Sequence, residues 1–114
     1  DNTAFVTQSG IVGADSLITQ SGTGNTATVT QSDDGDNNDG DGDVPPANDS
    51  TVAQTGDRNE AIVNQTAQSF VDPNRSMVDQ SGSDNSATVT QFDDEQSSSI
   101  VQTSDFNTAT VTQG

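Results

Sequence analysis

One seven-residue pattern recurs along the whole chain and constrains the fold more than any other feature. Every second position reads Asn, Ala or Ser, Val or Ile, and Gln, and the heptad Asn-Thr-Ala-Thr-Val-Thr-Gln stands unchanged at 25–31 and 107–113. Alternation of this kind, with β-branched residues between, is typical of a β-strand, and no 3.6-residue period supports a helix. We therefore expect one kind of strand, repeated many times.

The pattern occurs nine times, with Val or Ile always third and Gln always fourth. Its second position alternates between Ala and Ser without a break, so the chain has five Ala-type and four Ser-type strands. The Ala-type strands are expected at 2–8, 25–31, 59–65, 85–91 and 107–113. The Ser-type strands are expected at 14–20, 48–54, 74–80 and 96–102.

The connections between strands are of two kinds. Four residues join each Ser-type strand to the next Ala-type strand, and three of these connections carry a glycine at their second position, as a tight turn with positive φ requires (Gly22, Gly56 and Gly82). The return connections vary in length, at 9–13, 32–47, 66–73 and 92–95. Repeat architectures commonly accept insertions at one edge in this way.

These features predict an all-β fold, a β-solenoid of two parallel cross-β sheets. Each rung is a strand, a turn and a second strand, of about 22 residues, and nine strands make about four and a half rungs. The two sheets face each other about 10 Å apart, and like residues stack about 4.8 Å apart. The whole chain, 1–114, is expected to be one domain, with an acidic loop inserted at 32–47.

The inward amides and valines are the predicted core ladders. Side chains stacked on their own copies can exchange amide hydrogen bonds along the solenoid axis, which offsets the cost of burying them. The residues chosen are Asn2, Asn25, Asn48, Asn59, Asn74, Asn85, Asn107, Gln8, Gln20, Gln31, Gln54, Gln65, Gln80, Gln91, Gln102, Gln113, Val29 and Val111. No charged residue falls at an inward position, whereas a slip of one residue would bury Asp15, Asp49, Glu60, Arg75 and Asp79.

Composition limits the function. Only 26% of the residues are hydrophobic and the net charge is −16, which without the repeats would indicate disorder. There is no Cys and no His, so disulfides and thiolate metal sites are excluded and the commonest general base is missing. Asp93 and Asp94 lie in a turn with no apolar pocket, so no enzyme is expected. The acidic balance argues against nucleic acid, and no stretch is apolar enough to span a membrane.

The repeats resemble the curlin repeats of bacterial curli subunits. The family's pattern of Ser, Gln, Gly, Gly, Asn, Ala and Gln is met by Ser16, Gln20, Gly22, Gly24, Asn25, Ala27 and Gln31, and by the blocks ending at Gln65, Gln91 and Gln113. The chain departs from it at Ala14 and Gln96, which replace Asn, at Ser104, which replaces a turn glycine, and in placing Ser two residues further into the strand. The resemblance implies a secreted subunit of an extracellular functional amyloid, with biofilm-matrix and adhesion roles and dedicated secretion and nucleation partners.

The outermost strands carry the pattern without a cap. Open strand edges that bear Asn, Val and Gln are templates for another copy, so we expect a homopolymer. Five Ala-type strands against four Ser-type strands leave half a rung unpaired. Two explanations remain open: a Ser-type strand precedes Asp1, or a partner strand is supplied across the junction between subunits.

The acidic insertion offers a second site. Asn37, Asp39, Asp41 and Asp43 have the alternate spacing of the first ligands of an EF-hand-like calcium loop, but the closing Glu is absent. The alternative is a solvated acidic loop without a metal. No cofactor is otherwise required. A calcium-stabilised repeat segment of a larger surface adhesin is therefore a rival function.

Outward threonines suggest another rival, a monomeric ice-binding β-solenoid. The Thr rows of two strands form its face (Thr26, Thr28, Thr30, Thr108, Thr110 and Thr112). The same face carries Phe5, and also Glu60, Ile62 and Asn64, which would interrupt a flat array. Thr also simply suits an exposed strand.

Overall fold

The computed structural model describes residues 1–10, 14–33, 48–67, 73–93 and 95–114. These residues form nine strands and no helix, so none of them forms a helix that could cross a membrane. The strands are β1 Thr3–Ser9, β2 Asp15–Ser21, β3 Thr26–Asp33, β4 Asp49–Thr55, β5 Glu60–Ala67, β6 Arg75–Ser81, β7 Ser86–Phe92, β8 Ser97–Gln102 and β9 Thr108–Gln113.

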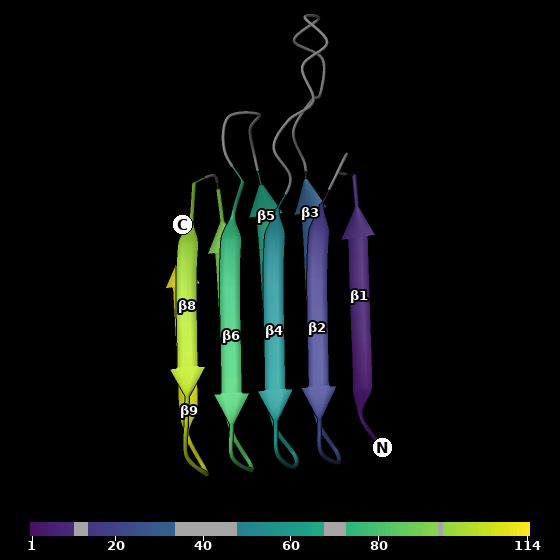
Figure 1. The fold of residues 1–114 in the computed structure, drawn as a ribbon. Coiled ribbons are helices and arrows are strands. Elements are labelled where there is room, and N and C mark those ends of the chain that lie inside the picture. The colour runs from purple at the N-terminus through teal and green to yellow at the C-terminus, as the bar shows by residue number, and fades with distance from the viewer. Residues whose placement is uncertain (11–13, 34–47, 68–72, 94) are drawn as a thin grey trace, which may run out of the picture.

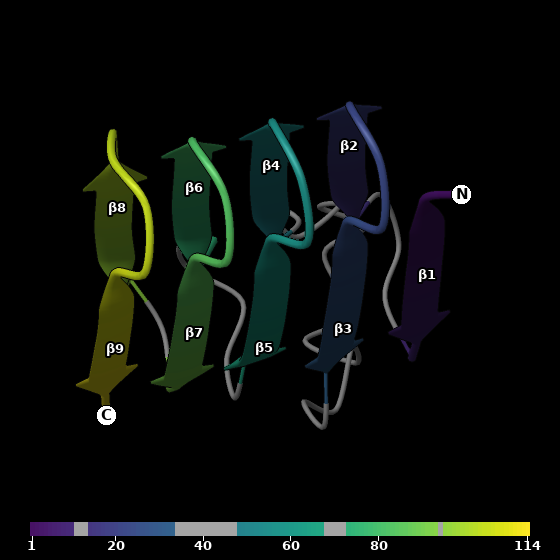
Figure 2. The same cartoon turned by 90° about the horizontal axis from the view of Figure 1, so that it is seen from below.

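The strands lie in two sheets that separate the two sequence types. The Ala-type strands form a five-stranded sheet in the order β1-β3-β5-β7-β9, and the Ser-type strands form a four-stranded sheet in the order β2-β4-β6-β8. Strands of the two sheets run in opposite directions, as the arrows of Figure 1 show. Seen from the turn edge, each tight turn carries the chain from one sheet across to the other (Figure 2). The predicted β-solenoid is confirmed.

Every pair of neighbouring strands is parallel and in register. Ala27 lies beside Ala61, Val29 beside Val63 and Gln31 beside Gln65, and the other pairs repeat this match. Side chains along a strand alternate between the two faces of the sheet. Because the strands are in register, identical sequence positions stack on one another through each sheet.

The interior between the sheets is thin and uncharged. Its apolar part consists of small and β-branched side chains, nearly all of them completely buried (Ala27, Val29, Val52, Ala61, Val63, Val78, Ala87, Val89 and Ile100). Burying one valine contributes about 1.5–3 kcal/mol. The buried polar residues are all Asn, Gln or Ser. The interior therefore depends on hydrogen bonds between amides as well as on apolar contact.

The glycines at the second turn position fit only because they lack a side chain. Gly22, Gly56 and Gly82 have φ of 103°, 109° and 108°, and a Cβ on Gly22 would overlap the carbonyl oxygen of Gly56 in the next turn. The last turn, 103–106, tolerates Ser104 because its backbone reaches positive φ only at Phe106. The departure at Ser104 therefore reflects a different turn conformation.

Candidate functional site: the stacking faces

Two continuous ladders of glutamine side chains run through the solenoid. In the five-stranded sheet, Nε2 of each Gln donates to Oε1 of the next, at 2.8, 2.9, 2.9 and 3.0 Å, from Gln8 through Gln31, Gln65 and Gln91 to Gln113. The four-stranded sheet has the same ladder, at 2.8, 2.9 and 2.8 Å, from Gln20 through Gln54 and Gln80 to Gln102. All these bonds point the same way, with the donor nearer β1 and the acceptor nearer β9.

The second Nε2 hydrogen of each Gln ties the two sheets together. Gln54 donates to the backbone oxygen of Thr26 at 3.1 Å, and Gln65 donates to that of Asp49 at 3.1 Å. Gln54 and Gln65 are each only 1% exposed. Because their donors and acceptors are all satisfied, burial of these polar groups does not carry its usual penalty.

The asparagines behave differently from the expected amide ladder. Asn25 Oδ1 accepts the backbone N–H of Asn59 at 2.9 Å, and Asn25 Nδ2 donates to the oxygens of Ser21 and Gly56 at 3.0 and 2.8 Å. Among the described residues, only Asn107 donates to another Asn side chain, Asn85, at 3.1 Å. The asparagines lie just before their strands, so their side chains form hydrogen bonds with the nearby turn and with the backbone of the next rung. The asparagines therefore do form hydrogen bonds along the axis, but for most of them the donor is the backbone N–H of the next Asn and not its side-chain amide.

Most predicted ladder residues lie in the interior, although the outermost ones do not. The fully buried members, at 0–1% exposure, are Asn25, Asn48, Asn59, Asn74, Asn85, Gln31, Gln54, Gln65, Gln80, Gln91 and Val29. Gln102 is 6% exposed. Gln20, Asn107, Val111 and Gln113 are partly buried, whereas Asn2 and Gln8 are exposed.

The two ends of the stack carry complementary hydrogen-bonding groups. Oε1 of Gln8 and Oε1 of Gln20 accept no hydrogen bond from any described residue, because each ladder starts there. At the other end, Gln102 and Gln113 each donate one Nε2 hydrogen to a backbone oxygen and keep a second that no described residue accepts. One end therefore offers acceptors and the other offers donors.

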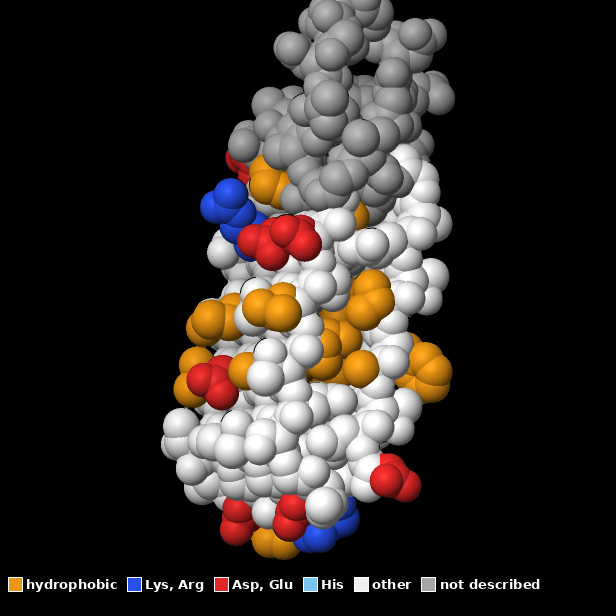
Figure 3. Space-filling model, turned by 45° about the vertical axis from the view of Figure 1, so that its right-hand side comes forward, with side chains coloured by type: hydrophobic (Ala, Val, Ile, Leu, Met, Phe, Trp, Pro, Cys, Tyr) orange, Lys and Arg blue, Asp and Glu red, His pale blue; other side chains and the backbone are white. Residues whose placement is uncertain are grey.

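The β1 end also exposes apolar surface. Val6, at an inward position, is 48% exposed, and the outward residues Phe5 of β1 and Leu17 of β2 are 60% and 61% exposed. Figure 3, which turns this end forward, shows apolar side chains gathered across the middle of the face. Exposed apolar area on an open strand edge is typical of an interaction surface.

The tight turns form a third, exposed ladder that the sequence analysis did not predict. Asp57 accepts from both N and Oγ1 of Thr23 in the preceding turn, each at 2.9 Å, and these bonds lower the pKa of its carboxyl. Asp84 accepts two bonds from Arg58, at 2.7 and 2.6 Å, which lower the pKa of Asp84 and raise that of Arg58. The sequence does contain a signal for this ladder. The third positions of successive turns alternate between a hydroxyl residue and an acid (Thr23, Asp57, Ser83 and Asp105).

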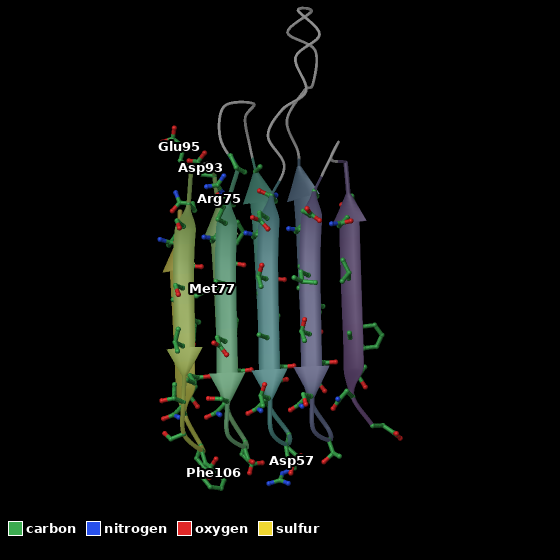
Figure 4. The ribbon with its side chains drawn as sticks, viewed as in Figure 1. Asp57, Arg75, Met77, Asp93, Glu95 and Phe106 are labelled. Carbon is green, nitrogen blue, oxygen red and sulfur yellow. The ribbon has the colours of Figure 1, made fainter. Side chains whose placement is uncertain are left out.

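At the opposite edge the charged side chains gather near the connection after β7. Figure 4 shows Arg75, Asp93 and Glu95 close together there, and Asp57 and Phe106 at the turn edge. A shallow surface hollow of about 310 Å³ is lined by Pro73, Arg75, Glu95, Gln96 and Ser97. Nothing in it resembles a catalytic arrangement of nucleophile and base.

No group of three or more metal-binding side chains occurs within the ranges that the structure describes. The calcium ligands suggested by the sequence, Asn37, Asp39, Asp41 and Asp43, lie outside those ranges. The calcium loop therefore stays a prediction.

Comparison with known families supports the resemblance noted in the sequence. Residues 17–41 and 72–92 match the family model of the curlin associated repeat. These two segments are therefore similar to curlin repeats. The first match covers most of β2, the turn and β3, and the second covers β6, the turn and β7. No curated protein and no solved structure gave a significant match.

The strand pairing and the glutamine ladders continue beyond the two matched segments. The rungs β4–β5 and β8–β9 pair in register with the matched rungs, position by position. Their glutamines continue the same ladders. All four strand–turn–strand rungs therefore share the same strand register and glutamine ladders, and β1 adds a fifth Ala-type strand.

Proposed function

We propose that this protein is the structural subunit of an extracellular, curli-like amyloid fibre, formed by end-to-end stacking of solenoids. The observation that carries the proposal is the pair of glutamine ladders, which end in acceptors at β1 and β2 and in donors at β8 and β9. Complementary, unlike ends favour head-to-tail association, which produces filaments and not closed pairs.

Addition of a subunit would extend the interactions already present between rungs. A docked copy supplies a backbone ladder for each open strand edge, acceptors for the terminal Gln donors, and apolar cover for Val6. The end strand orders the incoming chain because its inward pattern is the same as that of the strand it receives. This is templated growth.

The surface charge fits a protein that must stay soluble before it assembles. The net charge is −16, and no charged side chain is buried among the described residues. Repulsion between like-charged chains opposes side-by-side aggregation, and salt or divalent ions screen it. The family resemblance supports a location outside the cell, in a biofilm matrix with an adhesive role, and secretion and nucleation partners.

Electron microscopy and fibre diffraction of the purified protein test the proposal. We expect unbranched fibres with a meridional reflection at about 4.7–4.8 Å from the strand spacing. A monodisperse monomer without that reflection, at concentrations of tens of micromolar and at physiological salt, would contradict it. That result would favour a single repeat segment of a larger adhesin.

The calcium loop is tested in the same assay. If Asn37, Asp39, Asp41 and Asp43 hold calcium, EDTA during assembly should change the rate or the yield of fibres, and added calcium should restore it. Magnesium at equal ionic strength is the control for charge screening. An assembly rate unchanged by EDTA would remove calcium from the proposal.

The outward threonines do not lead us to a second function. In the five-stranded sheet, β5 places Glu60, Ile62 and Asn64 between the threonines of β3 and those of β7. The Thr face is thus interrupted in its middle strand. Fibre assembly is the function we propose. We therefore expect that the protein shows no thermal hysteresis, which an ice-binding protein would show.

A further inference from the structure

The nine strands pose a geometric problem for stacking. The sheets contain five and four strands, and the ladder contacts place each strand of one sheet at a level between two strands of the other. If a second copy stacked without rotation, its β1 would lie on β9. The four-stranded sheet would then lack one strand at every junction, and the edges of β8 and the next β2 would face a gap with unpaired backbone groups.

The hydrogen bonds show that the two sheets are chemically equivalent. Gln54, in a Ser-type strand, donates to the oxygen of Thr26, the residue after Asn25. Gln65, in an Ala-type strand, donates to the oxygen of Asp49, the residue after Asn48. Exchanging the two sheets therefore turns the Gln54–Thr26 hydrogen bond into one of the same kind as the Gln65–Asp49 hydrogen bond.

The asparagine bonds repeat this equivalence. Nδ2 of Asn25 donates to the oxygen of Ser21, which follows Gln20 in the other sheet. Nδ2 of Asn74 donates to the oxygen of Thr66, which follows Gln65. Since the strands of the two sheets run in opposite directions (Figure 1), a half-turn about the stacking axis exchanges the sheets and keeps neighbouring strands parallel.

We propose that successive copies in the fibre are related by a half-turn, so that the next copy's β1 completes the four-stranded sheet on β8. The next copy's β2 then lies on β9. This inference rests on the proposed fibre and concerns the nine strands described here. With an odd number of strands, only the half-turn leaves no strand position empty at the junction.

The half-turn gives each open group at the junction a partner of the right kind. Gln102 donates to Gln8 of the next copy, and Gln113 donates to its Gln20, which continues both ladders. Val6 of the next copy stacks on Ile100 and is covered by Val111, so a side chain that is 48% exposed becomes enclosed.

The outward positions at this junction also agree. Ser97, Ser99 and Val101 of β8 receive the next copy's Thr3, Phe5 and Thr7, and none of these carries a charge. Asp15 is the only charged residue that β2 brings to β9, whose outward residues are all Thr. No like-charged pair is created within the paired strands themselves, so these strands meet no cross-strand repulsion.

Cysteine cross-linking distinguishes the two arrangements, because the chain has no cysteine of its own. In the half-turn fibre Thr7 lies beside Val101 of the previous copy, and in the unrotated fibre it lies beside Thr112. Neighbouring strands are about 4.8 Å apart, within the Cα separation of a disulfide. The variants are T7C/V101C and T7C/T112C, with T7C alone as the control.

We expect oxidised T7C/V101C fibres to give a ladder of covalent oligomers on a non-reducing denaturing gel. T7C/T112C and T7C fibres should stay monomeric on that gel. A ladder from T7C/T112C instead, or fibres in which neither pair cross-links, would overturn the half-turn. Absence of fibres from the unmodified protein would instead reject the proposed function.

Helical reconstruction of unmodified fibres gives an independent answer, should a cysteine variant fail to assemble. The half-turn predicts a rotation near 180° and a rise of about 22 Å per subunit, whereas unrotated stacking predicts little rotation and about 24 Å. The second pair of values would overturn the inference.

Discussion

β1 and β3 have the same inward residues and opposite surroundings. Each reads Asn, Ala, Val and Gln at alternate positions, yet Val29 of β3 is completely buried and Val6 of β1 is 48% exposed. β3 has a strand on each side and Ser-type strands facing it, whereas β1 pairs only with β3. The heptad alone does not create an interior; its neighbours do.

This difference separates residues that hold the solenoid together from residues that hold copies together. A residue in β3, β5 or β7 contributes to the fold of one chain. The same residue in β1 is available to a second chain. Substitutions at matched positions in β1 and an interior strand should therefore affect different measurements.

The largest difference is expected for a charge placed in the valine stack. Val63→Asp puts a carboxylate at a completely buried position between Val29 and Val89, which should cost several kcal/mol and abolish the β-sheet signal in circular dichroism. Val6→Asp should leave that signal in place and stop fibre growth. Equal loss of the signal in both variants would remove the distinction between β1 and the interior.

Breaking a glutamine ladder should have the next largest effect. Gln65→Leu keeps the size of the side chain but leaves the buried Oε1 of Gln91 without its donor. Nε2 of Gln31 loses one acceptor and keeps the backbone oxygens of Asp15 and Asn48. At about 1–3 kcal/mol for an unpaired buried group, guanidinium unfolding should show a loss of about 1–3 kcal/mol.

Gln8→Leu is the matched change in β1. It removes the donor of the Oε1 of Gln31 and of the backbone oxygen of Ala14. Both bonds lie near an exposed end of the stack, so the loss should be about 1 kcal/mol or less. A loss as large as that of Gln65→Leu would mean that β1 is as tightly bound as an interior strand.

The sequence alone was enough to predict the strands, their register and the turn glycines, because a period of two and a fixed four-residue turn leave one way to exclude charge from the interior. It was not enough for the asparagines. An amide at the first position has a turn oxygen and a backbone N–H in reach, and only coordinates decide which of them Asn25 bonds. The strand count of five and four did predict an unpaired half rung, but only the coordinates show that Val6 is left 48% exposed by it.

A smaller effect of opposite sign is expected in the serine column. Ser98 Oγ, in the last Ser-type strand, is buried and has no partner, whereas Ser76 donates to Ser50 at 3.4 Å in the interior. Ser98→Ala removes an unsatisfied hydroxyl and should raise the free energy of unfolding by up to about 1 kcal/mol, while Ser50→Ala should lower it or leave it unchanged. Destabilisation by Ser98→Ala, measured by the same guanidinium titration, would point to a partner for this hydroxyl.

The smallest effect should come from the exposed turn ladder. Hydrogen bonds from Thr23 lower the pKa of Asp57, and the paired Arg58 lowers that of Asp84. A carboxyl whose folded-state pKa is lowered stabilises the fold above its unfolded pKa, near 4, and this stabilisation is lost as the pH falls through the folded value. Wild type should therefore exceed the variant Asp57→Asn/Asp84→Asn in stability at pH 7, and the gap should narrow below about pH 4.

Asp79→Asn is the control for that comparison, since it removes one exposed charge from β6 without touching a turn. Screening by salt should reduce the Arg58–Asp84 contribution, because the Arg58 side chain is exposed and that of Asp84 is partly exposed. A gap that persists unchanged at pH 2 would show that the asparagines act through the geometry of the turn, and not through loss of charge. The turns would then owe their stability to the backbone hydrogen bonds between them, which the last turn, 103–106, also makes although it has no glycine.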